Sequence, residues 1–247
     1  MIREIAEHRS HRRFRPDPIP AAVMSEMLEA AVRASNTGNM QAYSIVVTTD
    51  PELLQSLAPT HLNQPTAHAP AIITFCADVR RFSRWCELRG ATPEYDNFVW
   101  FLGAMTDAVL ASANLVLQAE AHGLGICYLG TTHYNAPEIT EILRLPDSVI
   151  PVMALSCGYP ATEVQLTDRL PLEAVVHSDV YREPSDAEIE SFWAAREASP
   201  ETAELLKAND LPTLARIFTE RRYKGEDNRA FSRKYFDHLV EKGFFNQ

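Results

Sequence analysis

The densest group of anion-binding side chains lies near the start of the chain, in the segment HRSHRRF at residues 8–14. An arginine guanidinium presents a planar fork of donors that suits phosphate, and serine adds a neutral donor. The segment could therefore hold a phosphomonoester. Composition alone favours the plainer interpretation, a solvated basic stretch, because short motifs often match by chance.

Two further segments carry polar groups or glycines where a ligand could bind. SNTGNMQ, at 35–41, could hydrogen-bond a ribityl chain and a heteroaromatic edge, or it could be a helix-ending turn that needs only Gly38 and Asn39. GLGICYLGTT, at 123–132, lacks the GxGxxG spacing of a Rossmann site. Its Gly130 and Thr131 could present backbone N–H groups to a planar ligand, or Gly130 could be an ordinary strand-to-loop glycine.

Several function classes are excluded or disfavoured by composition and motifs. The sequence has no GxSxG, HExxH or Walker motif, and its only closely spaced histidine pair, His8 and His11, has basic neighbours, so no metal site is expected. A formal charge of −10 argues against binding to nucleic acid or to a membrane. The four cysteines form no CxxC pair and are expected to be reduced. The N-terminus has no apolar run, so a cytoplasmic location is expected.

The elements that would position these segments form an α+β pattern. Apolar runs predict strands at 43–49, 71–77, 126–129 and 149–155. Helical spacing predicts helices at 1–9, 20–35, 51–57, 97–122, 137–144 and 231–242. The helix at 97–122 is long enough for a membrane, but it carries Asp107, Asn114, Gln118 and Glu120, so it is expected in a large core or a subunit interface.

The length and composition predict one large domain. Residues 1–183 form its core. Residues 184–225 are polar and helical, and we expect them to run over the surface as an excursion. Residues 226–247 then complete the same domain with the last helix.

Taken in order, these segments resemble the nitroreductase superfamily, specifically the branch of flavin reductase P and the oxygen-insensitive major nitroreductases. HRSHRRF, RASNTGNMQAYS, APAIITFCAD and GLGICYLG each match a motif of that branch, and LRLPDSVIPVMALSCGYP and LTDRLPLEAVVHSDVY follow at similar spacing. The resemblance covers nearly the whole chain. Each motif is weak alone, but the ordered set is specific.

The resemblance implies a nitroreductase-like α+β fold with a central, mainly antiparallel sheet flanked by helices. It implies a homodimer with the long helix at the interface, a helical C-terminal excursion, and FMN bound non-covalently between the subunits. NADPH or NADH would reduce the flavin, and small-molecule electron acceptors would reoxidise it in a ping-pong cycle through flavin N5. No side chain need be catalytic in such a cycle.

The resemblance also implies which residues hold the flavin. At the phosphate it places Arg9 and Arg169, with His8 and Ser10 beside them, and at the pyrimidine edge Arg12. The other subunit would contribute Asn36, Thr37, Gly38, Asn39 and Gln41. Gln64 would reach the ring, and Tyr128, Leu129, Gly130 and Thr131 would lie along the isoalloxazine.

Two departures from the branch pattern affect ligand binding. Thr167 stands where the branch has a lysine directed at the phosphate, and Arg9 or Arg13 could compensate. Arg221, Arg222 and Lys224 fall near the region where the branch recognises its nicotinamide nucleotide. This cationic cluster could favour the 2′-phosphate of NADPH, or it could be a solvated charge run.

The function expected from the sequence is that of an FMN-dependent NAD(P)H oxidoreductase acting on nitroaromatics, quinones or free flavins. One alternative is a specialised reductase or oxidase of the same fold with a non-nitro substrate. Another is a flavin-binding or storage protein without turnover.

Overall fold

In the computed structural model, which describes residues 1–246, a four-stranded sheet has the order β1-β2-β4-β3, with every neighbouring pair antiparallel. The strands are β1 (Tyr43–Thr48), β2 (Ala71–Asp78), β3 (Gly125–Tyr128) and β4 (Val149–Gly158). β2 is buried along its whole length, as an unbroken apolar run requires of a strand covered on both faces. The predicted α+β fold with a mainly antiparallel sheet is confirmed.

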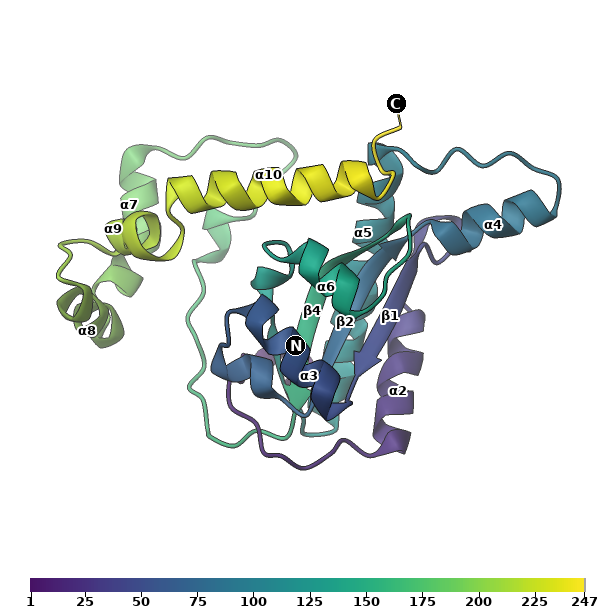
Figure 1. Ribbon diagram of the computed structural model, residues 1–247. Helices are drawn as coiled ribbons and strands as arrows, with labels where there is room; N and C mark the ends of the chain where they lie inside the picture. Colours follow the sequence, from purple (N-terminus) through teal and green to yellow (C-terminus); the bar gives the residue numbers. More distant parts are fainter. Residues whose placement is uncertain (247) are drawn as a thin grey trace. The chain divides into compact units, whose positions relative to one another are not determined.

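Helices cover both faces of this sheet (Figure 1). On one face α2 and α5 pack against Ile73, Phe75 and Ala77 of β2 in the main core. On the other, α3 and α6 pack against Ile72 in a smaller core. The α-helices are α1 (Arg3–Ala6), α2 (Ala21–Val32), α3 (Pro51–Leu57), α4 (Arg80–Leu88), α5 (Phe98–Ala121), α6 (Ala136–Ile142), α7 (Asp186–Glu197), α8 (Pro200–Asn209), α9 (Leu214–Ile217) and α10 (Gly225–Glu241).

The long helix α5 is the core helix of the sheet-containing unit. Asn97 caps its N-terminus by accepting the Trp100 N–H at 3.2 Å. Small buried residues such as Ala104, Ala108 and Ala111 let it approach the main core closely. Its length and composition would suit a bilayer, but its buried face belongs to this core.

The described chain divides into two compact units, one made of Met1–Gln165 together with the chain from Phe231 onward, the other of Leu166–Ala230. In the second unit, Ser185 and Glu188 form a capping box at the start of α7. Thr202, Leu214 and Ile217 are its buried residues. The domain boundaries expected after residues 183 and 225 stay a prediction.

Three helices differ from the sequence prediction. α1 is shorter than the predicted 1–9 because it buries no residue and lacks a side-chain cap. α4 was not predicted, since four of the nine residues in its sequence RRFSRWCEL are charged and only Cys86 is buried. α10 begins at Gly225 rather than 231, and Glu226 and Asp227 in its first turn favour a helix start. All four cysteines are buried and free, in agreement with reduced thiols.

Candidate functional site

The basic segment 8–14 lies beside β3 and the end of β4. Ser10 forms a parallel bridge with Ile126, and the His11 N–H donates to the Ile126 carbonyl at 2.8 Å. Farther along, Phe14 bridges Pro160. Backbone pairing therefore fixes the segment in place, which a freely solvated basic stretch would not need.

Gly125, in the GLGICYLG turn, is required by this arrangement. A Cβ at Gly125 would lie 2.7 Å from His11 Cγ, closer than real Cβ contacts allow. Without a side chain at this position, the imidazole of His11 can pack directly on the first residue of β3. One glycine of the motif thus serves the packing of segment 8–14.

Two residues of this segment, Arg9 and His11, line a cleft of about 240 Å³ whose other charged lining residues are Arg3, Glu4, Glu7 and Glu120. His8 Nδ1 lies 2.7 Å from Glu120 Oε1. Burial raises the pKa of Glu120, and the contact with His8 opposes that rise. Burial and the charges of Arg9 and His8 lower the pKa of His11. Arg9 donates Nη1 to the Glu7 carbonyl at 2.7 Å.

Arg12 is exposed, and its Nη1 lies 3.5 Å from the Ser10 carbonyl. Of the residues predicted to bind FMN, only Arg9 lines the cleft. Because Glu4, Glu7 and Glu120 also line it and their carboxylates would repel a phosphate, this cleft by itself does not identify the predicted FMN site.

The loop 36–41 leads from α2 into β1, and two of its residues are engaged within the chain. Thr37 donates its backbone N–H and its hydroxyl to Oδ1 of Asp107, on α5, at 3.0 and 3.1 Å. Asn36 Oδ1 accepts the Gln41 N–H at 3.1 Å. Asn36 and Thr37 thus shape the loop from inside.

The other residues of this loop are available to a ligand. Gly38 and Asn39 are exposed. The side-chain amides of Asn39 and Gln41 form no hydrogen bond with the residues that the structure describes, whereas the carbonyl of Gln41 accepts from Arg81. These two amides are the donors and acceptors that the loop can offer to a flavin.

The turn after β3 contains the next group of predicted residues. The Tyr128 hydroxyl lies 3.1 Å from Ser112 Oγ, and burial raises the pKa of Tyr128. Leu129 is buried, and its N–H donates to the Ala154 carbonyl at 2.8 Å. Gly130 is exposed with open space where a Cβ would lie. The N–H of Leu129 is therefore occupied, which leaves Gly130 and Thr131 as candidate donors.

A buried histidine links this turn to the segment that carries Gln64. His61 Nδ1 lies 2.9 Å from Thr131 Oγ1, and Gln64 Nε2 donates to the His61 carbonyl at 3.1 Å. His61 is fully buried, and burial lowers its pKa to about 4. The imidazole is therefore neutral at physiological pH, and it holds the two predicted ring-binding segments together.

The predicted cations of the second unit are exposed. Arg169 Nη1 donates to Thr167 Oγ1 at 2.7 Å and to the Asp168 carbonyl at 2.9 Å, so its guanidinium is turned onto its own segment. Arg221, Arg222 and Lys224 lie at and just after a π-helix at Phe218–Arg222, with the Arg222 guanidinium 5.5 Å from the Phe218 ring centroid.

Comparison with protein families decides the affiliation of the chain, because the Nitroreductase family model matches residues 5–159. The chain belongs to the nitroreductase family. This match contains segment 8–14, the loop 36–41 and the turn 128–131. The resemblance inferred from the ordered motifs is therefore confirmed, and the chain is an oxidoreductase of this family.

Curated and solved relatives within the nitroreductase family cover most of the chain. An FMN reductase (NADPH) from Bacillus subtilis is 35% identical over 188 residues, 75% of this chain and 76% of the relative. An oxygen-insensitive NADPH nitroreductase from Salmonella typhimurium is 32% identical over 73% of this chain and 74% of its own length. A solved chain from Bacteroides fragilis is 38% identical, covers 99% of this chain and 100% of its own, and has a TM-score of 0.97.

Sequence reasoning missed three residues that support the predicted site: Asp107, Arg81 and His61. Asp107 was noted only as a polar residue that argues against a membrane span, although it is the one acidic residue in the apolar run from Phe98 to Ala119. Asp78 and Arg81 are three residues apart at the end of a predicted strand. His61 gives no such signal, because nothing local marks a histidine that will be buried.

Proposed function

We propose that this protein is an FMN-dependent NAD(P)H oxidoreductase. The observation that carries the proposal is the family match over residues 5–159, which contains three segments with ligand-binding chemistry. The names of the curated relatives, an FMN reductase (NADPH) and an NADPH nitroreductase, support this choice of cofactor and reductant. When bound, FMN would supply the hydride-accepting group.

The residues present fit FMN by their chemistry. Arg9 and Arg169 would bind the phosphate through charge-assisted bonds, with His8 and Ser10 beside Arg9 in the sequence. The Arg12 cation would stabilise negative charge on the pyrimidine edge. The uncommitted amides of Asn39 and Gln41, the amide of Gln64 and the exposed Gly130 would meet the rest of the flavin. Thr167 has a hydroxyl instead of a charged group, so fewer cations are available to bind the phosphate.

We infer that the protein acts as a homodimer. The side of α5 away from the core exposes Val99, Leu102, Val109 and Leu110, and Val99 is 73% exposed. In the second unit, Leu172, Val175, Val176, Val180 and Tyr181 are also exposed. Apolar side chains exposed along one helix mark an interface, and a second copy would cover those of α5. The flavin would then lie at this interface and receive the loop 36–41 from the partner.

The proposed acceptors are nitroaromatics, quinones or free flavins, with the cytoplasm as the place of action. Arg221, Arg222 and Lys224 remain candidates for binding the nicotinamide nucleotide, and their charge would favour NADPH. A flavin-storage protein is the alternative of a different class, because Thr167 removes a cation that the branch directs at the phosphate.

Purification of the protein tests this proposal. We expect a yellow protein that releases FMN on heat denaturation and elutes at twice the 27.7 kDa of one chain. Turnover with NADPH and a panel of a nitroaromatic, a quinone and free FMN would then identify the acceptor class. A colourless protein that stays colourless after incubation with FMN would exclude the proposed function.

A further inference from the structure

The backbone of the loop 36–41 adopts a shape that it would not keep without support. Gly38, Asn39 and Gln41 have positive φ values of 56°, 54° and 51°. Glycine adopts this left-handed region freely, whereas a residue with a side chain is strained there. Such strain persists only where the surroundings determine the conformation, and it is common at ligand sites. The loop must therefore be held by other parts of the chain.

The first end of the loop is held from α5. Asp107 is 2% exposed, and Thr37 donates to it three times, from the backbone N–H to Oδ1 and Oδ2 at 3.0 and 3.1 Å and from the hydroxyl to Oδ1 at 3.1 Å. Within the part of the chain that the structure describes, Asp107 has no other hydrogen-bond partner. A buried carboxylate in an apolar helix is costly unless it is hydrogen-bonded, so these bonds explain why Asp107 is there.

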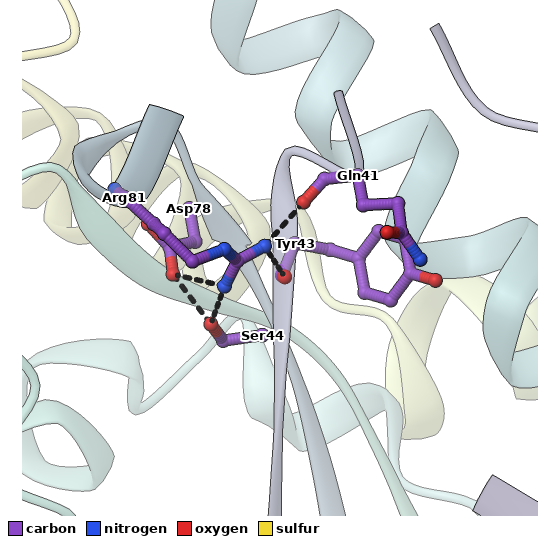
Figure 2. Close-up of polar contacts among 5 residues, drawn as sticks. All are labelled: Gln41, Tyr43, Ser44, Asp78 and Arg81. Carbon is purple, nitrogen blue, oxygen red and sulfur yellow. Dashed lines mark hydrogen bonds and ion pairs between the residues drawn. The ribbon is translucent and has the colours of Figure 1, made fainter. Parts of the chain in front are cut away.

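The second end is held from α4. Arg81 Nη2 donates to the carbonyls of Gln41 and Tyr43 at 2.5 and 3.0 Å, and Nη1 donates to Ser44 Oγ at 3.1 Å and Asp78 Oδ2 at 3.4 Å (Figure 2). The Ser44 hydroxyl also donates to Asp78. Figure 2 shows the guanidinium between the carboxylate of Asp78 on one side and the two backbone carbonyls on the other. One arginine thus fixes the direction in which the loop enters β1.

We propose that Asp107 and Arg81 are positioning residues that preorganise the loop 36–41 for flavin binding. The inference rests on the proposed function, because it takes this loop to be a flavin contact. It also divides the loop by role. Asn36 and Thr37 face the chain and maintain its shape, while Asn39 and Gln41 carry the amides that face the ligand. Because these contacts order the loop before the flavin binds, the cost of ordering the loop does not reduce the free energy of flavin binding.

The test compares variants at each anchor with matched controls on the same helices. Asp107→Asn keeps the volume but removes the charge and one of the two acceptor oxygens, so a single neutral oxygen is left for the N–H and the hydroxyl of Thr37. Arg81→Gln removes the bonds to Gln41 and Tyr43. Asn114→Ala serves as the control on α5, because among residues 1–246 the Asn114 side chain bonds only the Ala30 carbonyl. Arg84→Gln serves on α4, because within the same range the Arg84 side chain bonds only Glu87.

Three readouts on the purified holoproteins separate positioning from general stability. We expect FMN release to be about tenfold faster in Asp107→Asn and in Arg81→Gln, with a changed visible circular dichroism of the bound flavin. Hydrogen exchange of peptides covering 36–41 should also be faster, and Asn114→Ala and Arg84→Gln should behave like wild type. Arg81→Lys, which keeps a donor, should recover part of the retention.

A cycle with Thr37→Val adds a test of the Asp107 contact itself. Thr37→Val removes the hydroxyl bond to Asp107 and keeps the two backbone bonds, so the increase in FMN release in the double variant should be smaller than the product of the two single increases. A yellow wild type with wild-type release rates in Asp107→Asn and Arg81→Gln would overturn this inference alone. A wild type that holds no FMN would overturn the proposed function and this inference together.

Discussion

Replacing Arg9 or Arg169 with alanine is expected to weaken FMN binding by about 10- to 150-fold. A hydrogen bond to a charged group is worth about 1.5–3 kcal/mol, and about 1.4 kcal/mol corresponds to a factor of ten. The chain is expected to depend strongly on these two arginines because Thr167 stands where the branch carries a lysine. Titration of the apoprotein with FMN, followed by quenching of flavin fluorescence, measures the effect.

The matched control for these variants is Arg15→Ala. Arg15 is exposed, pairs with Asp17 at 3.3 Å and lies 5.0 Å from the Tyr159 ring centroid, but it does not line the cleft. It should keep the affinity of the wild type. Arg9 and Arg169 each bond a backbone carbonyl of their own segment. Unchanged affinity in both Arg9→Ala and Arg169→Ala would refute their assignment to the phosphate.

We expect His61 to make the free energy of unfolding depend strongly on pH. In the native state burial lowers the pKa of His61 to about 4, below its ordinary value of 6.5. Between these two pH values the unfolded chain binds a proton that the native state does not. Stability is therefore full above pH 6.5 and falls as the pH drops towards 4. The free energy of unfolding contributed by this group changes by about 3 kcal/mol over that interval.

Urea unfolding of the wild type and of His61→Asn between pH 7.5 and about 4.5 isolates this contribution. The asparagine can still contact Thr131 but does not titrate, so the stability of the variant should fall less steeply with acidity. His68→Asn is the control, because His68 is exposed in the same part of the chain. Parallel pH profiles for wild type and His61→Asn would show that the buried imidazole does not cause the acid sensitivity.

The main elements of the fold could be predicted because each is encoded locally. The strand β2 is a continuous apolar run, and α5 is an apolar segment bounded by Asn97 and Gly123. The prediction was wrong for helices that bury few residues, because such helices lack a clear apolar pattern. α4 buries only Cys86, and the early part of α10 is polar. The mainly antiparallel sheet followed from the family resemblance, whereas the strand order was not predicted, since no local pattern specifies which strands pair.

For the candidate site too, the sequence predicted the local segments but not the contacts between distant residues. The ordered motifs identified the segments, but the contacts that shape them join residues far apart. Thr37 and Asp107 are separated by 70 positions, as are His61 and Thr131. Arg81 reaches Gln41 across 40 positions. No periodicity or spacing within one sequence reports such pairs, so the anchors of the loop became visible only in the folded chain.

Anaerobic reduction of the purified protein by NADPH and by NADH tests the central claim most directly. An FMN-dependent oxidoreductase should lose its visible flavin absorbance on addition of either nucleotide or both, with faster bleaching by NADPH if the cations at 221–224 bind the 2′-phosphate. Admission of an electron acceptor should restore the colour. A protein that contains FMN but keeps its full absorbance with both nucleotides would contradict the claim and identify a flavin-binding protein without turnover.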